Sequence, residues 1–127
     1  MGQMLVQGGQ VAENLARAED LILEAGRRDC EVVVLPECLD LGWTDPSARE
    51  LATGTPGVTR DRVANAACRA GVTMVAGLTE KSGAKIFNTA VCFDQAGVLL
   101  STHREVNTLD IAQDLYTAGR SGARCRG

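Results

Sequence analysis

The sequence predicts an α/β fold in which amphipathic helices alternate with apolar strands. Two segments with helical spacing of apolar residues, 11–28 and 58–70, are each followed by a short apolar run, 31–35 and 72–78. Because strands separated by a helix usually lie parallel, these runs are expected to be neighbours in a mostly parallel sheet. The 127 residues have the size of one small domain, and no repeat or linker divides them.

The first helix and strand have clear limits. Gly26 comes near the end of the helix predicted for 11–28, and Pro36 stops the strand predicted for 31–35. That strand contains three consecutive valines, a pattern typical of strands covered on both faces, so both faces are expected to be buried. The apolar residues with helical spacing are Leu15, Ala18, Leu21, Ile22 and Ala25.

The middle of the chain is rich in Gly and Pro over 39–57, with one short helix expected at 47–52. Gly71 closes the second long helix, and Ser82-Gly83 is a turn signal after the strand at 72–78. The last regular elements are strands at 86–93 and 98–104, which a short Gly-containing turn joins into an antiparallel hairpin.

The charge of the chain is a weak indication of binding partners. A net charge of -3 and a pI near 5.1 give no reason to expect nucleic acid or an anionic membrane as a partner. No apolar run approaches the roughly 18–20 residues that span a bilayer. The segment 120–127 carries three Arg but no aromatic residue that could stack on bases, and it is expected to be a disordered tail.

The five cysteines form no CxxC pair and no cluster with the single histidine, so neither a metal site nor a cofactor is expected. Cys68 and Cys92 lie in apolar stretches and are predicted to be buried. An odd cysteine count without a signal peptide favours a reducing, cytoplasmic setting.

Glu37 is the first candidate for chemistry. It follows the strand 31–35 in the sequence Leu35-Pro36-Glu37, and ligand sites of open α/β sheets collect beyond the carboxyl ends of strands. A half-buried carboxylate at this place is suited to proton transfer. The alternative is a glutamate at the end of a strand that faces water.

An ordered set of short motifs favours the first interpretation. Together the motifs resemble the N-terminal part of the nitrilase superfamily of carbon–nitrogen hydrolases, from residue 2 to about residue 121. Each motif alone is weak, but their order and spacing are specific. The motifs are Gln3-Met4, 14–18, 33–37, 75–80, 87–91 and 94–100.

The resemblance implies a partial α-β-β-α sandwich and a hydrolase of non-peptide carbon–nitrogen bonds. In that family a Glu activates a Cys nucleophile as general base, and a Lys stabilises the tetrahedral intermediate. Glu37 matches the family motif Leu-Pro-Glu and is therefore expected to be the general base. Amide, nitrile or carbamoyl compounds are the expected substrates.

The match fails at the family's lysine. After the last predicted strand this chain has His103-Arg104-Glu105, and Glu105 occupies the lysine position. A carboxylate there would bring two negative charges together and oppose the developing oxyanion. The alternative is that Glu105 is a solvated strand residue. Because neighbouring strand residues point to opposite faces, Arg104 is not expected to neutralise Glu105.

No cysteine of the chain fits the family's nucleophile. Cys125 lies in the Arg-rich tail without an apolar strand before it, and Cys38 is expected to point away from the Glu37 pocket. Asp114 is a candidate for the acidic residue that positions substrate in many family members, with Asp110 as the alternative. A helix-surface role is as well supported for either aspartate. His103 has no partner fixed by spacing, so a packing role is expected.

These observations predict a hydrolase-type portion over residues 1–121 and a divergent tail over 122–127, as in a truncated N-terminal fragment. The expected function is a carbon–nitrogen hydrolase that is inactive as this chain. The alternative is an interaction module without activity that pairs with a homologous subunit, consistent with a homo-oligomer. An unrelated small α/β binding domain would require all the motif matches to be coincidence.

Overall fold

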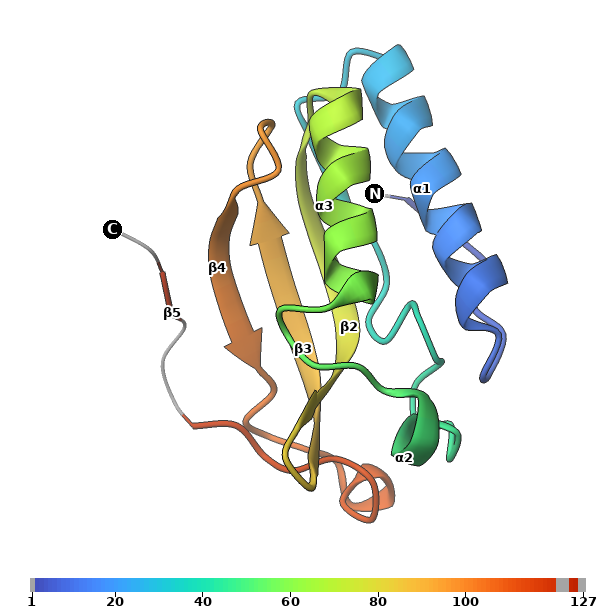
Figure 1. Cartoon of the computed structure of the whole chain (residues 1–127), viewed down its shortest axis with the longest axis vertical. Helices are drawn as coiled ribbons and strands as arrows, with labels where there is room; N and C mark the ends of the chain where they lie inside the picture. The colour runs from blue at the N-terminus through green and yellow to red at the C-terminus, as the bar shows by residue number, and fades with distance from the viewer. Residues whose placement is uncertain (1, 121–123, 126–127) are drawn as a thin grey trace.

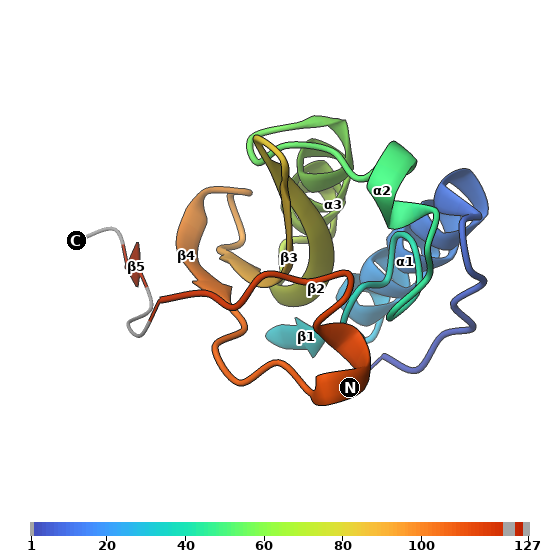
Figure 2. The same ribbon diagram turned by 90° about the horizontal axis from the view of Figure 1, so that it is seen from below.

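Two helices, α1 (Val11–Arg27) and α3 (Val58–Ala70), lie on the same side of a twisted sheet (Figures 1 and 2). The computed structural model describes residues 2–120 and 124–125. Both helices agree with the sequence prediction to within one residue, and α3 ends at Gly71 in the left-handed conformation, as expected for a C-terminal glycine.

The sheet has five strands in sequence order: β1 (Val32–Val34), β2 (Thr73–Ser82), β3 (Lys85–Phe93), β4 (Leu99–Arg104) and β5 (Arg124–Cys125). The predicted parallel pairing of the first two strands and the hairpin of β3 with β4 are confirmed. An additional antiparallel hairpin joins β2 to β3, because β2 continues past Leu78 to Ser82. The sequence pattern did not predict this hairpin, because the polar residues from Thr79 to Ser82 favour a turn over a strand.

The main core lies between the helices and one face of the sheet. Alternate residues of the strands point into it, which accounts for the burial of Val33 on β1 and Met74 on β2. Its largest fully buried side chains include Phe93, Ile22, Leu39, Met74 and Val63.

No helix or second sheet of the described residues covers the opposite face of the sheet, here called the open face. Val33 is 4% exposed, whereas its neighbours Val32 and Val34 are 54% and 43% exposed. The prediction that this strand is buried on both faces is therefore wrong for this chain. The burial predicted for two cysteines is wrong as well, since Cys68 is exposed on α3 and Cys92 is half-buried on β3.

A smaller apolar cluster closes one end of the sheet. It joins the loop after β1, the short helix α2 (Ala48–Leu51) predicted from the sequence, and the segment around the 3₁₀ helix η1 (Asp110–Ala112). The backbone N–H of Thr117 donates to Ile86 O at 2.7 Å, which ties this segment to the start of β3. The buried members are Cys38, Leu41, Ala48, Ala52, Ile86, Ala112 and Tyr116.

The predicted tail, 122–127, lies mostly outside the described residues. Within it only Arg124–Cys125 is described, as the strand that pairs with Ser101 and Thr102 of β4. The tail's disorder stays a prediction. No helix in the described part of the chain combines the length and apolar character that a bilayer crossing requires.

Candidate active site

Glu37 lies directly beyond β1, on the open face. The chain there passes very close to β2, because Gly77 has no side chain: a Cβ at this position would lie 2.3 Å from Glu37 Cα. Backbone hydrogen bonds from Gly77 N to Pro36 O and from Leu39 N to Gly77 O hold the two segments together at 3.0 Å each. Glycine at this position therefore lets the loop after β1 lie against the sheet.

A shallow pocket of about 270 Å³, here called the Glu37 pocket, opens beside this carboxylate. Its walls are apolar except for one amide, two carboxylates and the exposed imidazole of His103. The lining residues are Leu35, Glu37, Val75, Ala76, Gly77, Asn88, Ala90, His103 and Glu105.

Asn88 links the two carboxylates that the sequence placed close together. Its Nδ2 donates to Glu37 Oε2 at 2.8 Å and to Glu105 Oε2 at 3.2 Å, and the residue is only 7% exposed. The backbone N–H of Glu105 donates to Asn88 O at 2.8 Å. Glu105 is half-buried, follows the last residue of β4 and lines the Glu37 pocket.

The expected half-burial of Glu37 is also wrong. Its side chain is exposed, since no layer formed by residues 2–120 covers the open face beside it. Hydrogen bonding to Asn88 and the close passage over Gly77, rather than burial, position this carboxylate.

A second carboxylate, which the sequence analysis did not predict, lies buried beneath the loop after β1 that carries Glu37. Asp40 is 2% exposed, and its carboxylate accepts hydrogen bonds from Thr79 N at 3.1 Å and from Thr79 Oγ1 at 3.1 Å. The backbone N–H of Thr79 thus bonds to a side chain where a neighbouring strand would offer a carbonyl. Burial raises the pKa of Asp40 to about 6, although the hydrogen bonds from Thr79 oppose this shift.

Cys38 points away from the Glu37 pocket, as the sequence predicted. Its side chain is fully buried in the smaller apolar cluster, with Sγ 3.4 Å from the hydroxyl of Tyr116. Burial raises the pKa of the Cys38 thiol to about 11, which favours the protonated thiol over the reactive thiolate. The Tyr116 hydroxyl also accepts from Thr44 N at 3.0 Å, which fixes it.

Arg104 lies on the helix-covered face, opposite Glu105, as the alternation of strand residues predicted. Its guanidinium forms a two-pronged ion pair with the buried Glu80, at 2.6 and 2.8 Å, and stacks 3.9 Å from the centre of the Phe87 ring. Burial alone would raise the pKa of Glu80, but hydrogen bonds from Arg104 and Thr89 outweigh it and lower the pKa. This pair fixes the end of β4 next to Glu105.

The remaining candidates lie outside the Glu37 pocket. Asp114 is exposed and lines a separate cavity beside α2, and Asp110 is exposed at the start of η1. Within the described residues, no group of three or more His, Cys, Asp or Glu side chains is arranged to hold a metal ion.

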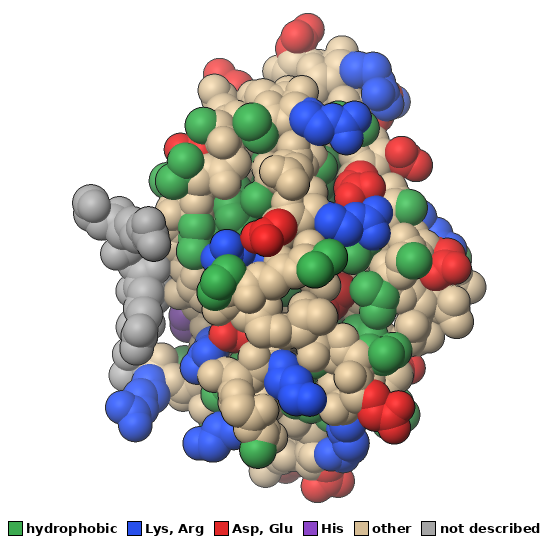
Figure 3. Space-filling model, viewed as in Figure 1, with side chains coloured by type: hydrophobic (Ala, Val, Ile, Leu, Met, Phe, Trp, Pro, Cys, Tyr) green, Lys and Arg blue, Asp and Glu red, His purple; other side chains and the backbone are tan. Residues whose placement is uncertain are grey.

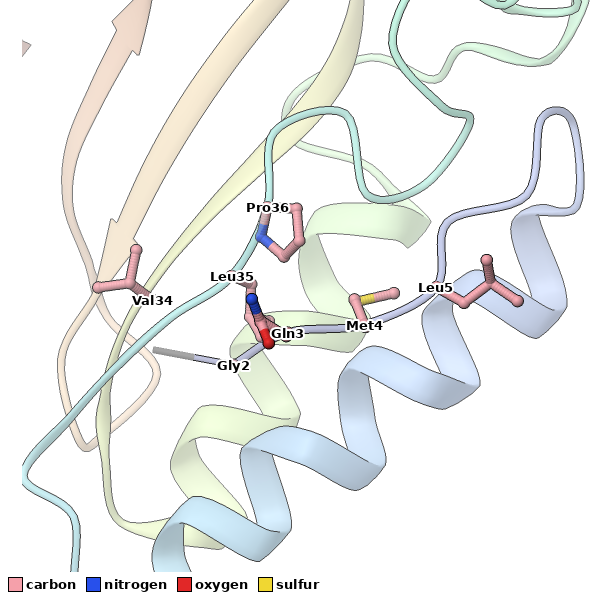
Figure 4. A pocket seen from close by; sticks show the side chains of 7 residues that line it. All are labelled: Gly2, Gln3, Met4, Leu5, Val34, Leu35 and Pro36. Atoms are coloured by element: carbon pink, nitrogen blue, oxygen red, sulfur yellow. The ribbon is translucent and has the colours of Figure 1, made fainter.

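An apolar hollow of about 550 Å³ lies on the other side of Leu35, along the extended N-terminal segment (Figure 4). Gly2 N donates to Val34 O at 2.8 Å, so this segment runs beside β1. Gln3 is the one polar side chain among the lining residues, and the hollow therefore offers no catalytic group. The lining residues are Gly2, Gln3, Met4, Leu5, Val34, Leu35 and Pro36.

Comparison with known proteins adds three findings. A family model described as carbon-nitrogen hydrolase matches residues 3–122. The omega-amidase NIT2 of Danio rerio is 37% identical over 101 residues, which cover 79% of this chain and 36% of that protein. The human omega-amidase NIT2 is 28% identical over the same length and is covered to 37%.

Solved structures show the same fold. The NitN amidase from Nesterenkonia sp. AN1 matches with a TM-score of 0.82 at 18% identity, over 94% of this chain and 48% of that one. A carbon–nitrogen hydrolase superfamily protein from Xanthomonas campestris, with an arsenic adduct in its active site, matches with a TM-score of 0.82 at 21% identity. The chain spans 36% to 37% of the length of the curated relatives described above, and under half of these solved chains.

Proposed function

This chain belongs to the carbon–nitrogen hydrolase family, and we propose that it carries the general base, Glu37, for hydrolysis of a non-peptide carbon–nitrogen bond in a small molecule. The observation that carries the proposal is the Glu37 carboxylate at the end of a parallel strand, in a pocket and held by Asn88. A carboxylate in this position can take a proton from a thiol or from water. The omega-amidase and amidase relatives support linear amides as the substrate class, with nitriles and N-carbamoyl compounds as the alternatives.

We further propose that these 127 residues do not turn over substrate by themselves. Glu105 would place a negative charge where the family has a lysine, and the Asn88 amide that bridges the two carboxylates does not supply a full positive charge. Cys38 is buried on the other side of the loop, so no described cysteine lines the Glu37 pocket. An amidase of the same fold has acrylamide added at its active-site cysteine, a group that this pocket lacks among its described residues.

Purified chain is expected to release no ammonia from a short linear amide, a nitrile or an N-carbamoyl amino acid above a protein-free blank. The physical reason is that no cysteine is among the described lining residues of the Glu37 pocket, and a well-placed general base alone contributes only about 10²–10⁴-fold. Ammonia release and intact-protein mass would both be measured. A mass increase equal to the acyl group, lost when a cysteine is replaced, would contradict the proposal.

The variant Glu105→Lys separates the two proposed defects. It restores the cation but supplies no thiol, so its rate is expected to equal the blank. Turnover by Glu105→Lys would mean that Cys38 or Cys125 acts as the nucleophile.

The second candidate function is an interaction module that pairs with a homologous subunit, including a second copy of this chain. The exposed valines of the open face, Val32 and Val34, favour it. Sedimentation velocity is expected to show association that weakens when both valines are replaced by threonine. A monomer at all concentrations, with or without an added full-length homologue, would contradict this function.

Four of the five cysteines, Cys30, Cys38, Cys68 and Cys92, are free, which supports a reducing, cytoplasmic setting as a further proposal. We propose residues 1–121 as the hydrolase-type portion, with 122–127 as a divergent tail, and a substrate-positioning role for Asp114 stays a prediction.

A further inference from the structure

A polar cavity of about 450 Å³ lies between α2, the tip of the β2–β3 hairpin and the segment after η1. It shares no lining residue with the Glu37 pocket. Its lining residues are Arg49, Lys81, Ala84, Ile86, Gln113, Asp114, Leu115, Tyr116 and Thr117. Here it is called the Arg49–Lys81 cavity.

Two cations from different elements line this cavity. Arg49 comes from α2, and Lys81 comes from β2, opposite Ile86 of β3 in the strand register. Arg49 Nη2 donates to the backbone oxygen of Asp114 at 3.1 Å, which holds the guanidinium at the edge of the cavity. Among the described residues, neither cation lies within 4.0 Å of a carboxylate oxygen. Five ion pairs form elsewhere among these residues, and none of them includes Arg49 or Lys81.

The local charge is opposite to that of the whole chain. The chain carries a net charge of -3, whereas the cavity lining holds two cations and one carboxylate, Asp114. Figure 3 shows Lys and Arg side chains, with Asp and Glu side chains among them, around the lower end of the molecule, where Figure 1 places α2 and the hairpin tip. Both cations are exposed, and a small anion bound in the cavity would be attracted by both charges.

We propose that the Arg49–Lys81 cavity binds a small oxyanion, a carboxylate or a phosphate group. The planar fork of Arg49 has donors left over after its bond to Asp114 O and matches two oxygens of such a group, while Lys81 adds a mobile point charge. This site is independent of the proposed hydrolase function, since none of its residues lines the Glu37 pocket.

The test is a titration of the ¹⁵N-labelled chain at constant ionic strength, with inorganic phosphate in one arm and acetate in the other. Saturable shifts are expected for backbone signals of residues 81–86 and 113–117 in at least one arm, and the arm identifies the preferred group. The variant Lys81→Met removes one exposed cation beside the anion, so its affinity for the anion is expected to fall about fivefold. Shifts that stay linear, or spread over the whole surface, would overturn the proposal.

Two matched variants make the result specific. Lys85→Met removes the same charge from the same hairpin but outside the cavity lining, so its affinity is expected to stay within about twofold of the parent. Asp114→Asn removes the opposing carboxylate and is expected to tighten binding about threefold. If Lys81→Met and Lys85→Met weakened anion binding equally, the effect would come from general surface charge, and the proposal would be wrong. Lys81 makes no side-chain hydrogen bond among the described residues, so its replacement is expected to leave the fold intact.

Discussion

Gly77→Ala is expected to lower the free energy of unfolding by about 3 kcal/mol, near the upper end for an overpacked core position. The added Cβ would lie 2.3 Å from Glu37 Cα and 3.0 Å from Cys38 N, both on the loop after β1. Backbone atoms cannot rotate away as a flexible side chain can, so either the loop or β2 must move. Urea unfolding followed by circular dichroism would measure the loss.

The matched control is Gly54→Ala. A Cβ at Gly54 would meet its nearest atoms at 3.7 Å, an ordinary contact, so this variant is expected to change the free energy of unfolding by less than about 1 kcal/mol. Equal stability of the two variants would mean that the loop carrying Glu37 is not held against β2 as described.

Asp40→Asn is expected to raise the free energy of unfolding by about 2 kcal/mol at pH 7. The pKa of Asp40 is about 6 in the folded chain, against an ordinary value of 3.8. The folded state therefore binds this proton more tightly than the unfolded state, and ionisation of Asp40 lowers stability as the pH rises from about 4 through 6. A pKa shift of this size corresponds to about 3 kcal/mol of unfolding free energy at pH 7. The gain in the variant is expected to be smaller, because the amide of Asn accepts weaker hydrogen bonds from Thr79 than the carboxylate does.

The measurement is the difference in unfolding free energy between parent and variant from pH 4 to pH 7.5. At pH 4 the variant is expected to be as stable as the parent or less stable. As the pH rises to about 7, the variant is expected to become increasingly more stable than the parent. Asp20→Asn serves as the control, because Asp20 is exposed and makes no side-chain hydrogen bond among the described residues. A variant that is less stable than the parent at pH 7 would show that the two hydrogen bonds from Thr79 outweigh the cost of burying the charge.

The sequence predicted those elements whose pattern depends on neighbouring residues. The three- and four-residue spacing of Leu15, Ala18 and Ile22 marks α1, because one face of that helix packs on the sheet. The valines of β1 mark a strand, but not which of its faces is covered, because coverage depends on layers elsewhere in the fold. The polar end of β2 was missed because Glu80 is paired with Arg104, a partner 24 positions away.

The candidate site could be predicted in part for the same reason. Glu37 and Glu105 were found through motifs that lie next to them in the chain. Asn88, which joins them, lies in the motif 87–91, but its role depends on the register of β3 against both carboxylates. Asp40 could have been found, since an aspartate between Leu39 and Leu41 in an apolar stretch is a signal of a buried carboxylate with a fixed partner.

The strand register also has a consequence for the order of folding. Partners across β2–β3 and β3–β4 are close in sequence, whereas partners across β1–β2 are roughly 40 residues apart with α3 between them. Closing the longer loop costs more chain entropy, so the β2–β3–β4 meander is expected to form before β1 docks. Glu37 follows β1, and Asn88 and Glu105 belong to the meander and its end. The two carboxylates are therefore expected to meet late in folding, when β1 docks on the meander and completes the Glu37 pocket.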